Sequence, residues 1–269
     1  MNEALYNSQE LLNNAVEVVY AAGAFIRSNR KKVLQEDIEE KGTNSLVSFV
    51  DKTTEKILVE GLRLLIPEAG FITEEDMVTQ GKKAWTWVID PLDGTTNFLH
   101  DIPVFSVSVA LLFEDNPEIA IVYEVVGDEM FTAINNKGAF LNSLPIRVTS
   151  ETNTKNVLFG TGFPYEKDNL TNGHLDVLQK VLLHSRGIRR MGSAAVDLCY
   201  VACGRFGVFY ETDLNSWDVA AGGLIVQEAG GLVSSLYGTQ SWLTGENILA
   251  CAPGLEKETL WLMQDFRKS

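Results

Sequence analysis

The residues most able to do chemistry lie in the segment 87–98, which reads WVIDPLDGTTNF. An apolar run ends at Asp90, Pro91 fixes the next φ angle, and Asp93-Gly94 turns the chain, so two carboxylates share one tight turn. Either of the two threonines that follow would cap a helix beginning there. Carboxylates beside the NH groups of a helix start suit a cation, but they also serve as caps or turn formers, and this segment alone leaves both interpretations open.

Three further acidic positions favour the cation. The run EED at 74–76 directly follows an expected strand, and three adjacent acids repel one another unless a cation lies nearby. Asp218 follows Ser216, a candidate N-cap, and lies where the first turn of a helix favours a carboxylate. Asp51 is either a helix cap or a further member of the same acidic cluster. Each position also has an ordinary interpretation, as a solvated loop, a first-turn acid or a cap.

An oxygen-rich cluster of this kind suits Mg²⁺, a hard cation held by a few carboxylates together with substrate phosphate and water. An EF-hand is excluded because the third, fifth and ninth positions counted from Asp90 are Leu92, Gly94 and Phe98, which offer no side-chain oxygen. The spacing of Asp90 and Asp93 also disfavours an aspartyl nucleophile of the haloacid-dehalogenase type, in which a single residue separates the two aspartates.

Two amphipathic helices and a run of strands are expected before residue 150, with strands and helices alternating after it. Apolar residues recur at intervals of three and four over 12–26 and 57–65, the period of a helix with one buried face. Strands are expected at 71–73, 85–89, 104–113, 119–126 and 130–134, the last three as an antiparallel meander, and then at 157–160, 188–190 and 208–210. The later helices are expected at 170–183, 194–202 and 217–229.

This order of elements predicts two halves. Residues 1–150 form an α+β half with a large antiparallel sheet and the main metal-binding loops, and residues 151–269 form an α/β half that contributes Asp218 and substrate contacts. A site is expected at their junction.

The composition of the 269 residues is that of an ordinary globular protein, with 22 Lys and Arg against 36 Asp and Glu and a net charge of -14. Such a charge predicts that neither nucleic acid nor an anionic membrane is a partner. The spacings of the three cysteines fit neither a zinc ribbon nor a redox pair, which indicates a reducing compartment. The sequence also shows no basic and apolar leader and no long apolar run. A soluble, cytoplasmic protein is therefore expected.

Six ordered segments together resemble the inositol monophosphatase family of metal-dependent phosphatases. They are Lys41-Gly42 with Asp51, ITEE at 72–75, WVIDPLDGTTNF at 87–98, GAFLN at 138–142 with IRVTS at 146–150, GSAA at 192–195, and Glu211 with WDVAAG at 217–222. The combination of DPLDGTT with WDVAAG is highly specific, and the matches extend over nearly the whole chain. The resemblance implies a five-layered αβαβα sandwich, as in inositol monophosphatase and fructose-1,6-bisphosphatase, with Mg²⁺ dependence, frequent Li⁺ inhibition and a homodimer.

The resemblance also implies roles for individual residues. The first of two Mg²⁺ ions would be bound by Glu74, Asp90 and the Leu92 carbonyl, and the second by Asp90, Asp93 and Asp218. The catalytic set would be Asp51, Thr95 and Glu74, with Asp51 and Thr95 orienting the attacking water and Asp51 also near a third, more weakly held ion. The substrate would contact Asp93, the NH groups of Gly94 and Thr95 at the phosphate, and Ser193, Ala194 and Glu211 at the hydroxyls.

The chain departs from the family pattern at a few positions. The family commonly has Asp and Thr where this chain has Ser45 and Ser48, Thr in place of Ser193, and a small residue in place of Asp76. These departures concern metal affinity and substrate fit rather than the chemistry.

The function expected from these residues is hydrolysis of a small sugar-type phosphate monoester, nominally inositol monophosphate, by metal-activated water. Fructose-1,6-bisphosphatase and 3',5'-bisphosphate nucleotidase are alternatives within the same superfamily, and the nucleotidase is disfavoured because its members more often carry Lys-Glu-Phe where this chain has TTNF. A catalytically silent regulatory relative is the alternative from another class. Such a silent relative would be expected to lack at least one metal-binding side chain, whereas every proposed carboxylate is present in this chain.

Overall fold

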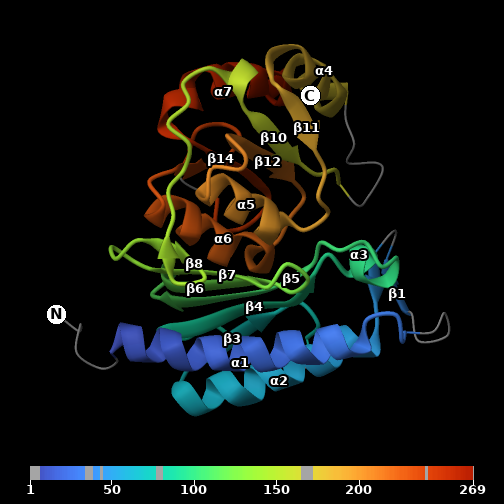
Figure 1. Ribbon diagram of the computed structural model, residues 1–269, viewed down its shortest axis with the longest axis vertical. Helices are drawn as coiled ribbons and strands as arrows, with labels where there is room; N and C mark the ends of the chain where they lie inside the picture. Colours follow the sequence, from blue (N-terminus) through green and yellow to red (C-terminus); the bar gives the residue numbers. More distant parts are fainter. Residues whose placement is uncertain are drawn as a thin grey trace.

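Two N-terminal helices form the outermost layer on one side of the molecule (Figure 1). In the computed structural model, which describes residues 7–33, 39–42, 45–76, 81–164, 172–239 and 242–268, α1 is Ser8–Asn29 and α2 is Phe49–Leu65. The side chains of Asn7 and Ser48 cap these helices by accepting hydrogen bonds from first-turn NH groups. The apolar face of each helix packs into one core with the adjacent sheet. Both predicted amphipathic helices are confirmed, and both are longer than predicted.

A seven-stranded sheet forms the second layer. Its strands, in spatial order, are β3 (Gly70–Thr73), β4 (Trp85–Asp93), β5 (Ser106–Phe113), β6 (Asn116–Glu124), β7 (Glu129–Ile134), β8 (Ala139–Leu141) and β9 (Leu144–Pro145). β3 and β4 run parallel and every other neighbouring pair is antiparallel, so the predicted meander is confirmed. β4 and β5 are buried almost throughout because helices cover both faces of the sheet.

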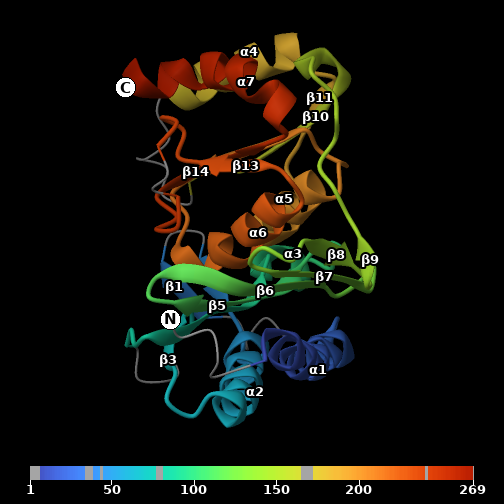
Figure 2. The ribbon, with the colours of Figure 1, turned by 90° about the vertical axis from the view of Figure 1, so that its left-hand side faces the viewer.

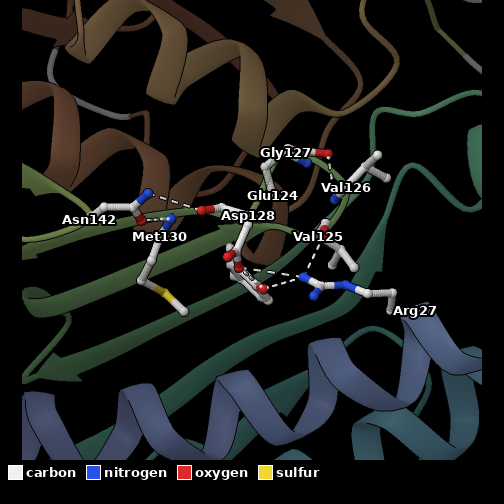
Figure 3. A network of polar contacts seen from close by, with 9 residues as sticks. Arg27, Glu124, Val125, Val126, Gly127, Asp128, Met130 and Asn142 are labelled. Carbon is white, nitrogen blue, oxygen red and sulfur yellow. Dashed lines mark hydrogen bonds and ion pairs between the residues drawn. The ribbon is translucent and has the colours of Figure 1, made fainter.

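Polar contacts tie the turn between β6 and β7 to α1 (Figure 3). Arg27 Nη2 donates to the Val125 carbonyl over 2.8 Å and to the Tyr123 hydroxyl, which in turn donates to Asp128. Burial and the Asp128 hydrogen bond raise the pKa of Tyr123 to about 12, so the hydroxyl keeps its proton. The first layer is therefore held to the sheet by polar as well as apolar contacts.

Helices α5 (Ala194–Ala202) and α6 (Ser216–Glu228) form the middle layer, between the two sheets (Figure 2). Their residues are mostly small or apolar, and 16 of the 22 are buried. This is the composition expected of helices with a sheet on either side. Both helices begin beside the end of β4 that carries the acidic motif, which makes this layer the one that positions the site.

The second sheet has the order β11 (Gly187–Arg189), β10 (Leu158–Thr161), β12 (Val208–Thr212), β14 (Asn247–Cys251) and β13 (Leu232–Ser234). Its outer face is covered by α4 (Asn172–His184), α7 (Glu256–Leu262) and the 3-10 segment η5 (Met263–Lys268) (Figures 1 and 2). The order helix, sheet, helix, sheet, helix confirms the predicted five-layered αβαβα sandwich. β13, β14 and α7 were missed because their apolar runs are too short to separate strand from helix by periodicity.

The remaining described elements are the hairpin of β1 (Glu39–Gly42) with β2 (Ser45–Val47), the short helix α3 (Thr95–Leu99), and the 3-10 turns η2 (Thr154–Asn156) and η4 (Pro253–Leu255). Among the helices that the structure describes, none combines the length and apolarity needed to span a membrane.

Candidate active site

Three aspartates from distant parts of the chain meet at one point. Asp90 and Asp93 lie at the end of β4, and Asp218 lies in the first turn of α6. One carboxylate oxygen from each lies within 4.8 Å of the others. The start of α6 is held there because Ser108 Oγ, on β5, donates to the Trp217 carbonyl over 3.1 Å. The structure thus brings together acids that are 128 residues apart in the sequence, as Asp90 and Asp218 are.

The start of α5 orients Asp93. Its Oδ2 accepts hydrogen bonds from Ser193 Oγ over 2.6 Å and from the Ala195 NH over 2.8 Å. Ser193 is the N-cap of α5, so the bonds that begin the helix also hold the carboxylate. With Oδ2 engaged in this way, Oδ1 is the oxygen available to a cation.

Asp90 and Asp218 are held by backbone NH groups in the same manner. Asp90 Oδ1 accepts from the Leu92 NH over 2.9 Å, and Asp218 Oδ2 accepts from the Asn215 NH over 2.6 Å. Asn215, rather than the predicted Ser216, is the N-cap of α6, because its side chain and Asp218 form a capping box. The Asp218 carboxylate therefore has a cap function and lies in the acidic cluster as well.

Glu74 lies beside this cluster, in the turn after β3. Its carboxyl is within hydrogen-bonding reach of Asp90 and is half-buried. The turn is fixed by Glu55, a fully buried residue of α2 that accepts a hydrogen bond from the Glu75 NH over 2.8 Å. Sequence reasoning missed Glu55, although its position four residues after Asp51, on the same face of a helix, was a usable signal.

The carboxylates raise one another's proton affinity. Burial, followed by the charges of Glu74, Asp93 and Asp218, raises the pKa of Asp90 well above its usual range. Burial and the Asp93 charge raise the pKa of Asp218 to about 7. Burial also raises the pKa of Asp93, against the hydrogen bonds that it accepts. Like charges crowded in this way are relieved by a proton or by a cation. Carboxylate oxygens are the donors that Mg²⁺ prefers, so the residues present fit that ion.

Asp51 and Thr95 form a second pair next to the cluster. Thr95 Oγ1 lies 2.9 Å from Asp51 Oδ1 and 3.0 Å from the Leu92 carbonyl, two acceptors for its one proton. Asp51 Oδ2 accepts from both the NH and the hydroxyl of Ser48, each over 2.8 Å. Burial raises the pKa of Asp51, and these hydrogen bonds oppose the rise. Ser48, one of the departures from the family pattern, thus fixes the acid of this pair.

The prediction that a threonine caps the helix after Asp93 is wrong. The N-cap of α3 is Gly94, in the left-handed region with φ +94°, and no side chain caps the helix. The Thr95 hydroxyl is not available as a cap because it faces Asp51 and Leu92.

Two further departures from the family pattern are Asp76 and Ser45. Asp76 is exposed after the Glu74 turn. The side chain of Ser45 lies outside the described residues, as does that of Lys41.

Four of the predicted substrate contacts line one pocket beside the acidic cluster. Asp93, Ser193, Ala194 and Glu211 border it, together with Asp218 and Arg190, whereas Gly94 and Thr95 are not among its lining residues. Glu211 fits only because residue 162 is glycine: a Cβ there would lie 1.8 Å from Glu211 Oε1. Burial raises the pKa of Glu211 to about 8, against the effect of the Arg190 charge. Arg190 is therefore the cation that the structure places at this pocket.

A larger hollow of about 580 Å³ lies between α1 and the strands β7 and β8. Its lining includes a single acid, Glu17, and a single cation, Lys137. The acidic cluster borders the smaller pocket through Asp93 and Asp218, so the candidate active site is assigned there.

Replacing Glu211 by Gln should make stability less dependent on pH in the presence of EDTA. The Glu211 pKa rises from 4.5 in the unfolded chain to about 8, so the folded protein binds the proton more tightly and loses stability as pH rises between these values. The full loss is at most about 5 kcal/mol. We expect Glu211→Gln to gain several degrees of melting temperature over wild type at pH 9 and little at pH 4.5, measured by calorimetry. A difference that stays constant with pH would contradict this assignment.

The sequence model of the inositol monophosphatase family matches residues 7–269, and the chain belongs to that family. A relative from Pasteurella multocida (strain Pm70), named Nus factor SuhB, is 40% identical over 253 residues, covering 93% of this chain and 94% of the relative. The crystal structure of the extragenic suppressor protein suhB from Bartonella henselae matches with a TM-score of 0.88 at 35% identity, covering 97% of this chain and 99% of that one. Staphylococcal SaIMPase-II with inositol monophosphate bound matches with a TM-score of 0.80 at 26% identity, covering 96% and 95%.

These names correct one expectation. The prediction that nucleic acid is not a partner is wrong, because several relatives are named Nus factor, a name that refers to transcription and so to a process on nucleic acid. The prediction rested on the net charge of -14. Net charge is a sum over the whole surface. It does not decide whether a local patch or a protein partner brings the chain to nucleic acid.

Proposed function

We propose that the chain is a Mg²⁺-dependent phosphatase that hydrolyses a small sugar-type phosphate monoester, with inositol monophosphate as its substrate. The observation that carries the proposal is the clustering of the Asp90, Asp93 and Asp218 carboxylates, two of which, Asp93 and Asp218, line a pocket together with Glu211. Membership of the family supports the activity, and the SaIMPase-II complex with inositol monophosphate supports the substrate.

In this proposal, residues 1–150 supply most of the metal site and residues 151–269 complete it. Mg²⁺ would be held by Glu74, Asp90 and the Leu92 carbonyl at one position and by Asp90, Asp93 and Asp218 at a second, with a third, weaker ion near Asp51. When bound, Mg²⁺ lowers the pKa of a water ligand and stabilises charge on the phosphoryl oxygens. The four carboxylates balance the charge of two divalent ions.

The residues of the chain orient the reactants. The Thr95 hydroxyl donates its hydrogen bond to Asp51 or to the Leu92 carbonyl. Its oxygen lone pairs can therefore accept a hydrogen bond from the attacking water. The NH groups of Gly94 and Thr95, at the start of α3, are suited to the phosphate oxygens. Glu211, Ser193 and Ala194, across the pocket, would face the substrate hydroxyls.

The test is release of inorganic phosphate from three substrates, with Mg²⁺ and with excess EDTA. We expect inositol 1-phosphate to be hydrolysed faster than fructose 1,6-bisphosphate or adenosine 3',5'-bisphosphate, and EDTA to abolish release. Fastest turnover of either bisphosphate would replace the proposed substrate. No release from any phosphate ester would support the silent, regulatory alternative. The homodimer, Li⁺ inhibition and the cytoplasmic location remain predictions.

A second function is favoured by the names of the relatives. We propose that the chain also acts in transcription, as a Nus factor, because the Pasteurella protein of that name aligns over 93% of this chain. The test is transcriptional read-through in an extract depleted of the protein, with wild-type chain or the Asp93→Asn variant added back. We expect both to restore wild-type read-through, since Asp93 is buried and the change leaves the outer surface intact. Failure of the wild-type chain to restore it would contradict this function.

A further inference from the structure

The backbone of Met191, in the loop before α5, is held on both of its polar groups by buried side chains that no step above uses. Asn97 Nδ2 donates to the Met191 carbonyl and to the Val104 carbonyl, each over 2.7 Å. On the other side, the Met191 NH lies within hydrogen-bonding reach of the Asp197 carboxylate. Asn97 is 6% exposed and Asp197 is 1% exposed. We call Asn97 and Asp197 the Met191 clamp.

The clamp lies where two chain segments meet backbone to backbone. Gly192 has φ +88°, and a Cβ there would lie 2.8 Å from Asn97 Nδ2. A Cβ on Gly94 would lie 3.0 Å from the Gly192 carbonyl. The two glycines thus let the turn after β4 approach the loop before α5 closely, because a Cβ at either position would meet the other segment.

This contact lies directly before the two groups that donate to Asp93. Ser193 is two residues after Met191, and its hydroxyl donates to Asp93 Oδ2. The Ala195 NH donates to the same oxygen. A movement of Met191 would carry both donors away from Asp93 and release its carboxylate from the orientation described above.

We infer that Asn97 and Asp197 are positioning residues, which orient the Asp93 carboxylate for Mg²⁺ by fixing the loop that carries Ser193. The inference rests on the proposed function, because it takes Asp93 as a metal ligand. Neither residue touches the substrate; both act through Ser193 and the start of α5.

Asp197 also shows why the clamp differs from ordinary core packing. Its Oδ1 is buried and has no hydrogen-bond partner among the residues that the structure describes. Burial, with the charges of Glu211 and Asp93 nearby, raises the pKa of this carboxyl well above its usual range. An asparagine at position 197 would still accept from the Met191 NH and would avoid burying a charge, so it serves as the conservative variant.

The principal test is Asn97→Asp, which keeps the shape of the side chain but replaces the NH₂ donor by an oxygen facing two carbonyls. We expect the dissociation constant for Mg²⁺, measured by titration calorimetry, to rise about 10- to 100-fold, and kcat/KM for inositol 1-phosphate to fall by a similar factor. Asn116→Asp is the matched control. Asn116 Nδ2 also donates to two carbonyls, those of Phe113 and Glu114, but in the exposed turn between β5 and β6. Its Mg²⁺ affinity should equal that of wild type. A folded Asn97→Asp variant with wild-type affinity would overturn the inference.

A second pair of variants, at Asp197, tests the same inference if Asn97→Asp does not fold. Asp197→Ala should weaken Mg²⁺ binding at least about tenfold, and Asp197→Asn should stay within about threefold of wild type. Wild-type affinity in the alanine variant, or equal loss in both, would overturn the clamp. If wild type binds Mg²⁺ but releases no phosphate from any ester, the proposed function fails. The Mg²⁺ dissociation constants of the variants then still test whether Asn97 and Asp197 orient Asp93. If wild type binds no Mg²⁺, both fail.

Discussion

Asp93→Asn should lower kcat/KM for inositol 1-phosphate about 1000-fold while the protein stays folded. The asparagine carbonyl can take the place of Oδ2 and still accept from Ser193 and Ala195, which keeps the start of α5 in place. Its NH₂ group then occupies the position of Oδ1, where a cation requires an oxygen. Loss of a metal ligand removes several kcal/mol of charge stabilisation, and about 4 kcal/mol corresponds to a factor of 1000.

Stability separates this effect from misfolding. Without metal, the melting temperature of Asp93→Asn should equal or exceed that of wild type, since a charge is removed from a crowded acidic cluster. The increase in melting temperature that Mg²⁺ gives wild type should be lost. Glu228→Gln is the control. Glu228 accepts from the NH groups of Asn136 and Gly138 at the far end of α6, so changing it should leave turnover unaltered. Wild-type turnover by Asp93→Asn, with the same Mg²⁺ dependence, would refute the metal assignment.

Local patterns in the sequence predicted most of the layers. The spacing of apolar residues located α1, which buries one face whose repeat is set by the backbone. α5, buried on nearly all sides, matched its predicted range, 194–202, within the expected alternation of strands and helices. Periodicity did not identify β13 and β14, since runs of three to five residues carry little repeat, whereas β11 and β12, of the same lengths, fell within the expected alternation of strands and helices.

The acidic site needed more than local pattern. Nothing in the spacing of Asp90 and Asp218 indicates that they meet. The resemblance to a known family supplied that expectation, and the fold brings the two carboxylates together. Asn97 was missed because its contact with the Met191 backbone spans 94 residues, and Asp197 because a single contact with the backbone six residues earlier leaves no periodic trace. The error about nucleic acid had a different origin, since net charge has no spatial resolution.

The positions of the helix starts suit the proposed binding of both metal and phosphate at one site. Asp51, Asp218 and the partners of Asp93 lie at the starts of α2, α6 and α5. Helix N-termini carry partial positive charge, which favours nearby carboxylates and, once these are neutralised by cations, a phosphate. The capping boxes of α2 and α6 therefore place acids in the site with the same hydrogen bonds that begin the helices.

Thr95→Val should lower kcat about 100-fold or more and leave Mg²⁺ affinity near that of wild type. Valine keeps the shape of threonine but removes the hydroxyl that lies between Asp51 and the Leu92 carbonyl. In the proposed mechanism this hydroxyl orients the attacking water, and groups that assist proton transfer contribute 100-fold or more. The Leu92 carbonyl and the carboxylates that would bind Mg²⁺ are unchanged, so titration calorimetry should give the wild-type dissociation constant. This separates Thr95 from Asp93, whose loss should affect both measurements.

Two further variants decide whether the Thr95 effect is chemical or structural. Thr95→Ser restores the hydroxyl and should recover most of kcat. Thr259→Val removes a hydroxyl of the same kind, which donates to the Leu255 carbonyl over 2.8 Å in the outer layer and is fully buried. Each of the two valine variants should lose about 1 kcal/mol of unfolding free energy with its hydrogen bond. Only Thr95→Val should lose turnover. If Thr95→Val kept the wild-type kcat, or if Thr95→Ser were as slow as the valine variant, the hydroxyl would have no part in positioning water, and Asp51 would have to act on the water without it.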